Sequence, residues 1–289
     1  MDLINLKKDL NYIASNLKID LFSKEQIIEE LGVKFINSIN KNIQNKSKVG
    51  IAFSGGVDSS LIAFLCKKYK KNFKLYTVGI GEREDSIWAK KIAHYLKLPI
   101  SIKNIDFDEA YDIIKKVTNI LKEDHPVKVG IGSTLYSVFS LIKNDNIDTV
   151  VTGLGSDTLF LGFEKYRKAL EKDNLMKEYL HGLKNIYKND VKRDLLIAKL
   201  FNLNLICPYL DKEFIEYCVR IDPKLKVNNE EKKIILRETA INLGLKKEFS
   251  NRKKLAAQYG SGFDKAIAIF AKENGFKYKR DFLNSLLEK

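Results

Sequence analysis

Residues 48–69 read KVGIAFSGGVDSSLIAFLCKKY, and this stretch decides the fold that we expect. Residues 48–53 are short and apolar enough for a buried parallel strand, and the Ser-Gly-Gly sequence at 54–56 is typical of a tight turn. Residues 59–69 have the periodicity of a helix. The stretch therefore predicts a strand, a glycine turn and a helix in direct succession.

The alternation of strands and helices extends to both sides of this unit. An amphipathic helix is predicted over residues 23–44, with Ser23 as its N-cap. Further strands are predicted at 75–80, 100–105 and 149–152, and further helices at 85–96, 107–121 and 134–143. This pattern predicts an α/β fold with an open, mostly parallel sheet and helices on both faces.

The second half of the chain has a different pattern. After Gly162 no further strand is predicted, and the helices expected there span residues 166–200, 212–220 and 230–243. We therefore expect three parts. These are an N-terminal helical segment over residues 1–45, an α/β core over 46–162, and a mainly helical C-terminal region over 163–289 that completes the active site.

The composition excludes several classes of protein. With 45% hydrophobic and 30% charged residues, the chain of 289 residues can bury enough apolar surface to fold. Cys66, Cys207 and Cys218 form no CxxC pair, so neither a disulfide framework nor a four-thiolate zinc site is expected. No apolar run approaches the roughly 20 residues that cross a bilayer, and the N-terminus has no secretory pattern. We therefore expect a cytoplasmic protein with no membrane partner.

The net charge of +14 comes from 51 Lys and Arg residues against 37 Asp and Glu residues. Such a charge is compatible with polyanionic partners such as nucleotides or nucleic acid. The charged residues are spread along the whole chain, however, and this distribution favours a solvated surface. A tRNA partner is therefore left open by the charge but is not favoured.

The turn at residues 54–60 is suited to bind a phosphate. Gly55 and Gly56 allow backbone N–H groups to point inward, and the start of the next helix adds free donors with a partial positive charge. Hydroxyl groups that can bond phosphate oxygens are those of Ser54, Ser59 and Ser60. Asp58 in an anion site requires a bridging cation, so we expect Mg²⁺. The loop lacks the lysine of GxxxxGK[ST], and no GxG pair elsewhere extends to GxGxxG, so neither a P-loop kinase nor a Rossmann dehydrogenase is expected.

The sequence SGGVDS matches the signature of the PP-loop, or N-type ATP pyrophosphatase, family. That resemblance implies an adenine nucleotide alpha hydrolase-like fold and cleavage of ATP between its α and β phosphates. Three later segments resemble the asparagine synthetase domain: GLGSDTLFLG at 153–162 is similar to SGEGSDELFGG, CPYLDKEF at 207–214 to PFLD, and EKKIILR at 231–237 to EKxxLR. The basic and glycine-containing segment at 252–262 resembles the loop that closes over pyrophosphate in that family. The resemblance covers roughly residues 27–270.

The resemblance implies an ATP-dependent carbon–nitrogen ligase that forms AMP and pyrophosphate. In the family, ATP activates an acid as an acyl-adenylate, and ammonia or an amine then attacks the acyl carbon to form an amide. The alternative is a PP-loop tRNA-modifying enzyme, which adenylates an oxygen of a base. The segments similar to asparagine synthetase argue against that alternative.

The resemblance also implies roles for the residues at matching positions. Pyrophosphate would be held by Ser54, Gly55, Gly56, Ser59 and Ser60. The nucleoside would be lined by Ala52, Val78, Gly79, Thr152 and Gly153. The expected catalytic residues are Asp58 and Asp157, which would hold magnesium, and Lys254, which would neutralise charge on the leaving group. Two alternatives stay open: Asp157 and Asp211 could be helix N-caps, and Lys254 could lie on a solvated face.

The sequence departs from the family in the part that supplies nitrogen. Glutamine-hydrolysing members have a nucleophilic cysteine at position 2, where this chain has Asp2, and only about 50 residues precede the loop. The resemblance therefore does not extend to the glutaminase domain of that family. We expect the nitrogen to come from free ammonia, from a separate glutaminase subunit or from an amine of the substrate.

The segments expected to bind the acid substrate also differ from those of the family. Leu154 and Thr158 stand where the family has acidic residues, and the segment HPVKVGIG at 125–132, expected to be a loop, is more apolar than a site for an amino acid should be. A leucine offers no partner to a buried ammonium group. We therefore expect an acid that is less polar or larger than aspartate, as a small molecule or borne by a macromolecule, in a pocket with Leu154 and Ile131. The alternative is that Leu154 only packs and a carboxylate from elsewhere replaces the glutamate.

Overall fold

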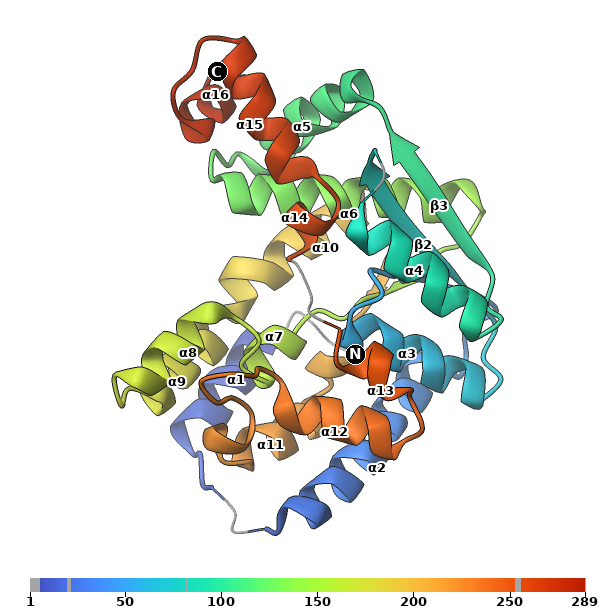
Figure 1. The fold of residues 1–289 in the computed structure, drawn as a ribbon, viewed down its shortest axis with the longest axis vertical. Helices are drawn as coiled ribbons and strands as arrows, with labels where there is room; N and C mark the ends of the chain where they lie inside the picture. Colours follow the sequence, from blue (N-terminus) through green and yellow to red (C-terminus); the bar gives the residue numbers. More distant parts are fainter. Residues whose placement is uncertain (1–5, 20–21, 82, 253–255, 289) are drawn as a thin grey trace.

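A computed structural model describes the chain except residues 1–5, 20–21, 82, 253–255 and 289. Its centre is a five-stranded sheet in the order β3-β2-β1-β4-β5, in which every neighbouring pair is parallel. The strands are β1 (Val49–Ala52), β2 (Phe73–Ile80), β3 (Ile100–Ile105), β4 (Thr149–Val151) and β5 (Asn204–Ile206). The predicted open parallel α/β sheet is therefore confirmed (Figure 1).

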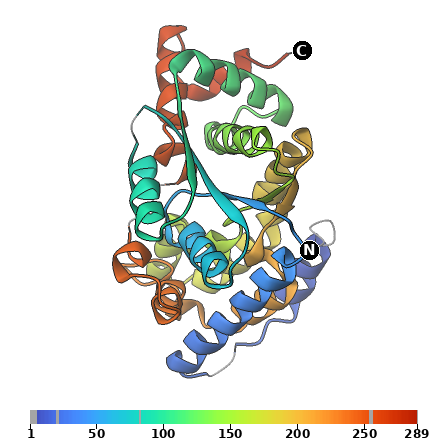
Figure 2. The ribbon, with the colours of Figure 1, turned by 90° about the vertical axis from the view of Figure 1, so that its right-hand side faces the viewer.

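Helices cover both faces of this sheet. Helices α3 (Val57–Lys68) and α4 (Glu84–Tyr95) connect the first three strands on one side, and α6 (Pro126–Asn144) lies on the other (Figure 2). Gly50 explains how closely α6 approaches β1, because a Cβ atom on Gly50 would lie only 2.8 Å from the side chain of Ile142. Strand β1 therefore has a glycine at the point where α6 crosses it.

The remaining helices extend the fold at both ends of the sheet. At one end α15 (Phe263–Glu273) and α16 (Lys279–Ser285) pack beside α5 (Phe107–Leu121) and α6 (Figure 1). At the other end α2 (Lys24–Ile43) packs against α11 (Lys212–Arg220) and α12 (Ile234–Asn242). The other helical elements are α1 (Leu6–Ser15), α7 (Ser156–Leu159), α8 (Glu164–Glu171), α9 (Leu175–Ile186), the π-helix η1 (Tyr187–Val191), α10 (Lys192–Leu200), the 3-10 turns η2 (Pro208–Leu210) and η3 (Pro223–Leu225), α13 (Lys247–Ser250) and α14 (Ala257–Gly260). None of the described helices is long and apolar enough to cross a lipid bilayer.

The predicted start of α2 is confirmed in detail. The hydroxyl of Ser23 accepts a hydrogen bond from the backbone N–H of Gln26, and the side chain of Gln26 accepts one from the backbone N–H of Ser23. This capping box satisfies two N–H groups that the helix itself leaves without acceptors. It fixes where the helix starts, so that Phe35 reaches the core and stacks on Tyr209 with 4.4 Å between ring centroids.

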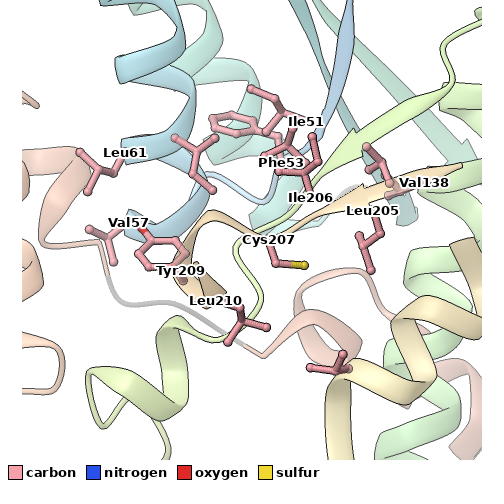
Figure 3. Packing of buried hydrophobic residues seen from close by; sticks show 14 of the residues in the cluster. Ile51, Phe53, Val57, Leu61, Val138, Leu205, Ile206, Cys207, Tyr209 and Leu210 are labelled. Carbon is pink, nitrogen blue, oxygen red and sulfur yellow. The ribbon is translucent and has the colours of Figure 1, made fainter. Parts of the chain in front are cut away.

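The core beneath the 54–60 turn joins distant parts of the chain. Figure 3 shows Ile51 and Phe53 of the first strand region packed near Ile206 and Tyr209 from the segment around β5. The hydroxyl of Tyr209 also donates a hydrogen bond to the backbone oxygen of Asp58, at 3.1 Å. The base of the predicted phosphate loop is therefore fixed by residues about 150 positions further along the chain.

Three predictions about secondary structure were wrong. A strand, β5, does follow Gly162; it has only three residues and ends at Cys207-Pro208, so it is too short to show a strand pattern. The helix predicted over 166–200 is interrupted between α8 and α9 and contains the π-helix η1. The predicted loop at 125–132 is instead the start of α6. The boundaries expected at residues 45 and 162 stay a prediction.

Glycines in a helix were the reason for the error at 125–132. A Cβ atom on Gly130 would lie 2.8 Å from Gln258, and one on Gly132 would lie 2.9 Å from Val117. These glycines permit close packing of neighbouring segments against α6, although glycine lowers helix propensity. Their role is therefore to make room and not to form a turn.

Candidate active site

The loop between β1 and α3 has the geometry of an anion-binding turn. Gly55 has φ +69°, and a Cβ atom there would lie 3.0 Å from the backbone nitrogen of Ala89. Gly56 is the N-cap of α3 and offers no side chain to cap it, so the first N–H groups of the helix have no side-chain acceptor. Ser54 and Ser59 stabilise the turn, since the Ser54 N–H donates to the Ser59 hydroxyl and the Gly56 N–H donates to the Ser54 hydroxyl, both at 3.3 Å. The loop can therefore present donors to a phosphate.

Lys233 lies between the two carboxylates that the sequence singled out. Its Nζ atom is 2.7 Å from both oxygens of Asp58, 2.7 Å from Oδ1 of Asp157 and 3.2 Å from the hydroxyl of Ser156. Asp58 and Asp157 come from α3 and α7, about 100 residues apart in the sequence. One ammonium group therefore holds together the ends of two helices that follow neighbouring strands.

The backbone packs closely against this ion cluster at Lys233 and Gly162. Lys233 adopts φ +60°, a conformation that costs a non-glycine residue about 1 kcal/mol or more. A Cβ atom on Gly162 would lie 2.1 Å from Oδ1 of Asp157 and 2.3 Å from Cε of Lys233. The side chain of Lys233 is only 4% exposed. The strained backbone and the required glycine both serve to bring a buried ammonium to the carboxylates.

The sequence prediction missed Lys233. It lies in the EKKIILR segment, but the pattern gave no reason to prefer it to Lys232, which is more exposed and pairs with Glu164. The resemblance of this segment to EKxxLR was the signal that could have found it, because the register that ends at Leu236 and Arg237 puts Lys233 at the lysine of the motif.

The donor set fits the magnesium that the sequence predicted. Mg²⁺ prefers oxygen ligands and is usually held by one or two carboxylates together with substrate phosphates. Asp58 and Asp157 supply two such carboxylates at the phosphate loop. Within the described ranges, no group of three or more His, Cys, Asp and Glu residues could hold a metal ion alone. These two aspartates would therefore hold magnesium only in company with the phosphates of a nucleotide.

A cavity that is open to solvent lies beside this cluster. The predicted site residues that line the cavity are Ala52, Ser54, Asp58, Ser59, Val78, Thr152, Gly153 and Asp157. They lie at or just after the carboxyl ends of β1, β2 and β4, where open α/β sheets bind ligands.

Other predicted residues lie just outside the cavity wall. Gly55 and Gly56 form the turn behind it, and a Cβ atom on Gly79 would lie 2.8 Å from the hydroxyl of Ser86. Ser60 is fully buried, and its hydroxyl has no hydrogen-bond partner among the described residues. Lys254 lies outside the described residues, so its predicted role stays a prediction.

Arg252 shows that the C-terminal loop reaches the phosphate loop. Its guanidinium pairs with the buried carboxylate of Asp85 and donates to the backbone oxygen of Ser54. It also lies over the ring of Trp88, 5.5 Å from the centroid. Residue 252 is therefore anchored beside the turn at 54–60. Closure of the segment at 252–262 over pyrophosphate stays a prediction.

Of the two aspartates that could have been helix N-caps, one is an N-cap and the other is not. Asp211 is the N-cap of α11, and its side chain accepts a hydrogen bond from the N–H of Phe214 at 3.4 Å. Asp157 is not an N-cap, because α7 starts after Gly155, which has φ +99°. The carboxylate of Asp157 instead contacts Lys233.

The cavity is also lined by a second charged cluster, which the sequence prediction missed. Arg193 donates to Asp194 from Nε at 2.8 Å and to Asp190 from Nη1 at 3.1 Å. Burial raises the pKa of Asp194 to about 6, against the lowering effect of Arg193. Leu154 and Ile131 line the same cavity, as the sequence predicted.

A family model for asparagine synthase matches residues 30–195 and 171–273 of this chain. The chain belongs to the asparagine synthase family. It is 32% identical, over 98% of its length, to a candidate glutamine-hydrolyzing asparagine synthetase of Methanocaldococcus jannaschii, and 27% identical, over 75% of its length, to asparagine synthetase of Mus musculus. The chain spans 58% of the first relative and 40% of the second, about half the length of the curated relatives it matches. The predicted resemblance is thus confirmed.

The solved structures are less similar to this chain than the curated relatives are. NMN synthetase from Francisella tularensis is 16% identical with a TM-score of 0.43, and the alignment covers 93% of this chain and 88% of that one. The U34-tRNA thiolase from Methanococcus maripaludis is 17% identical with a TM-score of 0.41, over 92% of this chain and 80% of that one. Likeness at these scores is too low to support an argument about function.

Replacing Lys233 by Met should destabilise the protein and make its stability depend on magnesium. The change removes a buried cation from two carboxylates, and breaking such a pair from one side typically costs about 3 to 5 kcal/mol. Millimolar Mg²⁺ should recover part of that loss, because a divalent cation that binds only the folded state stabilises it. Urea unfolding of both forms, with and without Mg²⁺, measures the effect.

Lys232→Met is the matched control, since Lys232 is the less buried neighbour and its ion pair with Glu164 lies at the surface. Its free energy of unfolding should change by about 0.5 kcal/mol or less. A Lys233→Met variant as stable as this control, or one that gains no more from Mg²⁺ than the wild type, would contradict the assignment.

Proposed function

We propose that this chain is an ATP-dependent ligase that cleaves ATP to AMP and pyrophosphate, adenylates a carboxylate and forms an amide with ammonia or an amine. The observation that supports this most is the convergence of the phosphate loop, Asp58, Lys233 and Asp157 beside one cavity at the strand ends. Membership of the asparagine synthase family supports the same reaction class.

The reaction has two balanced steps. First, an oxygen of the acid attacks the α-phosphorus of ATP, the bond between that phosphorus and the bridging oxygen breaks, and pyrophosphate leaves with the electron pair. Second, a nitrogen lone pair attacks the acyl carbon, AMP leaves with the electron pair of the acyl–oxygen bond, and the nitrogen loses a proton. Each step moves negative charge onto a phosphate that the protein must hold.

The residues around the loop would hold that charge. The amides of Gly55 and Gly56 and the start of α3 would bind the leaving pyrophosphate, with hydroxyls from Ser54 and Ser59 beside them. Lys233 adds a fixed positive charge. Magnesium, bound by the two aspartates together with the phosphates, would supply further positive charge to the triphosphate oxygens.

The nucleoside would lie across the ends of the central strands. Ala52, Val78, Thr152 and Gly153 follow or end β1, β2 and β4 and face the cavity. A Cβ atom on Gly153 would lie 3.0 Å from Cβ of Asp58, so a larger residue would push against the catalytic aspartate. The position of the nucleoside and that of the phosphates are therefore coupled through packing.

We further propose that the nitrogen comes from outside the described site. The relatives are named as glutamine-hydrolyzing, and this chain spans about half their length. A separate glutaminase subunit, free ammonia or an amine of the substrate would each supply a nucleophile to the cavity. A tRNA-borne acceptor is not favoured.

In turnover with Mg-ATP and an accepted acid, the nucleotide product should be AMP and the second product pyrophosphate. The reason is that the loop and its aspartates are suited to hold a diphosphate leaving group, so the bond that breaks is the one between the α and β phosphates. Chromatography of the nucleotides, combined with exchange of labelled pyrophosphate into ATP, measures this. ADP as the sole nucleotide product would overturn the proposal, and so would exchange that requires added tRNA.

Asp157→Asn provides the loss-of-function control for this assay. Removing one charge from a positioned cluster typically slows turnover about 10²-fold or more, while the protein remains folded. Asp148→Asn is the matched substitution at the opposite end of β4, on the exposed side, and should leave turnover unchanged.

We also propose that the accepted acid is not aspartate. Leu154 and Ile131 line the cavity where a small zwitterion would need polar partners. With aspartate, ammonia and Mg-ATP, asparagine should therefore not form at ordinary enzymatic rates, about 1 per second or faster. Amino-acid analysis of the reaction measures this, and asparagine at that rate would show the proposal to be wrong.

A further inference from the structure

Lys226 is a second fully buried lysine, and it does not line the cavity. It follows the 3-10 turn η3, and its Nζ atom donates to the hydroxyl of Tyr179 at 2.8 Å and to the backbone oxygen of Cys218 at 2.7 Å. Among the described residues no carboxylate forms an ion pair with it, and Asp222 attracts it only at longer range. The ammonium of Lys226 is therefore held by neutral oxygen atoms.

This burial has an energetic cost. Burial lowers the pKa of Lys226 to about 7, against the raising effects of Cys218 and Asp222. An apolar side chain of similar length, such as that of methionine, would pack there without placing an amine in the interior. A reason for lysine at this position therefore has to come from the groups that its amine contacts.

The hydroxyl of Tyr179 connects Lys226 to the short helix α7. It donates to the backbone oxygen of Leu159 at 3.4 Å. Leu159 is the last residue of α7 and lies two positions after Asp157, whose carboxylate lines the cavity and contacts Lys233. Through one hydroxyl group, Lys226 thus reaches the helix that carries one of the two proposed magnesium ligands.

The main chain of Lys226 reaches the cation of the same ion pair. Its backbone oxygen accepts a hydrogen bond from the N–H of Ile234 at 3.0 Å, and the next residue, Val227, forms an antiparallel bridge with Lys232. Lys233 lies between these two paired residues and has φ +60°. Lys226 is therefore connected to both sides of the ion cluster, by its side chain to the helix of a carboxylate and by its main chain to the ammonium.

The protonation of Lys226 decides which acceptor the hydroxyl of Tyr179 uses. An ammonium has three donors and no acceptor, so the single proton of Tyr179 is left for the oxygen of Leu159. A neutral amine has a lone pair, which competes for that proton.

The titratable groups that face the amine are few. They are Tyr179 from α9, Cys218 from α11 and, at longer range, Asp222 before η3. Burial raises the pKa of Tyr179 and of Cys218 far above neutrality, so both keep their protons there. The amine of Lys226 is therefore the group of this set whose charge changes near neutral pH.

We propose that Lys226 is a positioning residue, whose ammonium holds α7 through Tyr179 so that Asp157 stays in place to bind magnesium. This inference rests on the proposed Mg-ATP site. Lys226 contacts neither the cavity nor a magnesium ligand directly. Groups that orient the ligands of a metal typically change its affinity about 10- to 100-fold when they are removed.

Calorimetric titration with Mg²⁺ and the non-cleavable α,β-methylene ATP tests this without requiring turnover. At pH 6, Lys226→Met and Tyr179→Phe should each bind the magnesium nucleotide about tenfold more weakly than the wild type. The double variant should bind no more weakly than either, because both changes break the same chain of hydrogen bonds. Lys224→Met, at the exposed neighbour in η3, is the matched control and should bind as the wild type does.

The pH dependence separates this role from a loss of packing. For both single variants, the ratio of the variant's dissociation constant to that of the wild type should fall from about ten at pH 6 to about one at pH 9, because the wild-type amine is then neutral as well. Titration of the nucleotide itself cancels in this ratio. Tyr179→Phe keeps the test valid if Lys226→Met fails to fold.

Three results would overturn the inference. They are binding by both single variants that equals that of the wild type, a loss of the same size at pH 6 and pH 9, and losses that multiply in the double variant. A wild-type protein that binds no magnesium nucleotide would contradict the proposed function instead.

Discussion

The ammonium of Lys233 is the contact on which the candidate site depends. It joins the start of α12, from the C-terminal part of the chain, to carboxylates that follow β1, the central strand of the sheet, and its neighbour β4. Three negative or polar groups meet one buried cation in a space where Gly162 admits no side chain. Because a buried carboxylate without a cation is costly, the cluster fixes the separation of the strand ends as well as their charge.

Two further contacts complete this arrangement. Tyr209 holds the backbone of Asp58 from below, and Arg252 holds Ser54 and Asp85 from the side of the C-terminal loop. All three anchors, Lys233, Tyr209 and Arg252, come from beyond residue 200, whereas the loop they hold is near residue 55. The parallel sheet provides the site, and the later helical segments give it its charges. This explains why a predominantly helical region belongs to a nucleotide-binding core.

The sequence alone was enough to predict the elements and residues whose pattern lies within a short stretch of the chain. The strand, the glycine turn and the helix around residues 48–69 follow from patterns within about 20 residues, and Asp58 and Asp157 stood out because each lies in a recognisable motif. Lys233 was missed because the positive φ of this buried residue has no local sequence signal, and only the register of EKxxLR distinguishes it from Lys232. The strand β5 has three residues, which is too few for a periodic pattern.

The cluster at Asp190 was hidden for another reason. Charged residues in an amphipathic helical stretch are normally solvated, and only the π-helix and the packing of α10 against α6 bury Arg193 and Asp194. Long-range packing decides such positions. The same applies to Gly130 and Gly132, which resemble a loop in the sequence and are close-packing positions in the helix.

The most direct test is a crystal structure with α,β-methylene ATP and Mg²⁺. The β and γ phosphates should lie against the turn at 54–60, with the metal bound by Asp58, Asp157 and phosphate oxygens, the base beside Val78, and the α-phosphate open toward Leu154. A nucleotide bound elsewhere, or one whose triphosphate does not contact this turn while Lys233 remains between the two aspartates, would contradict the assignment of the site.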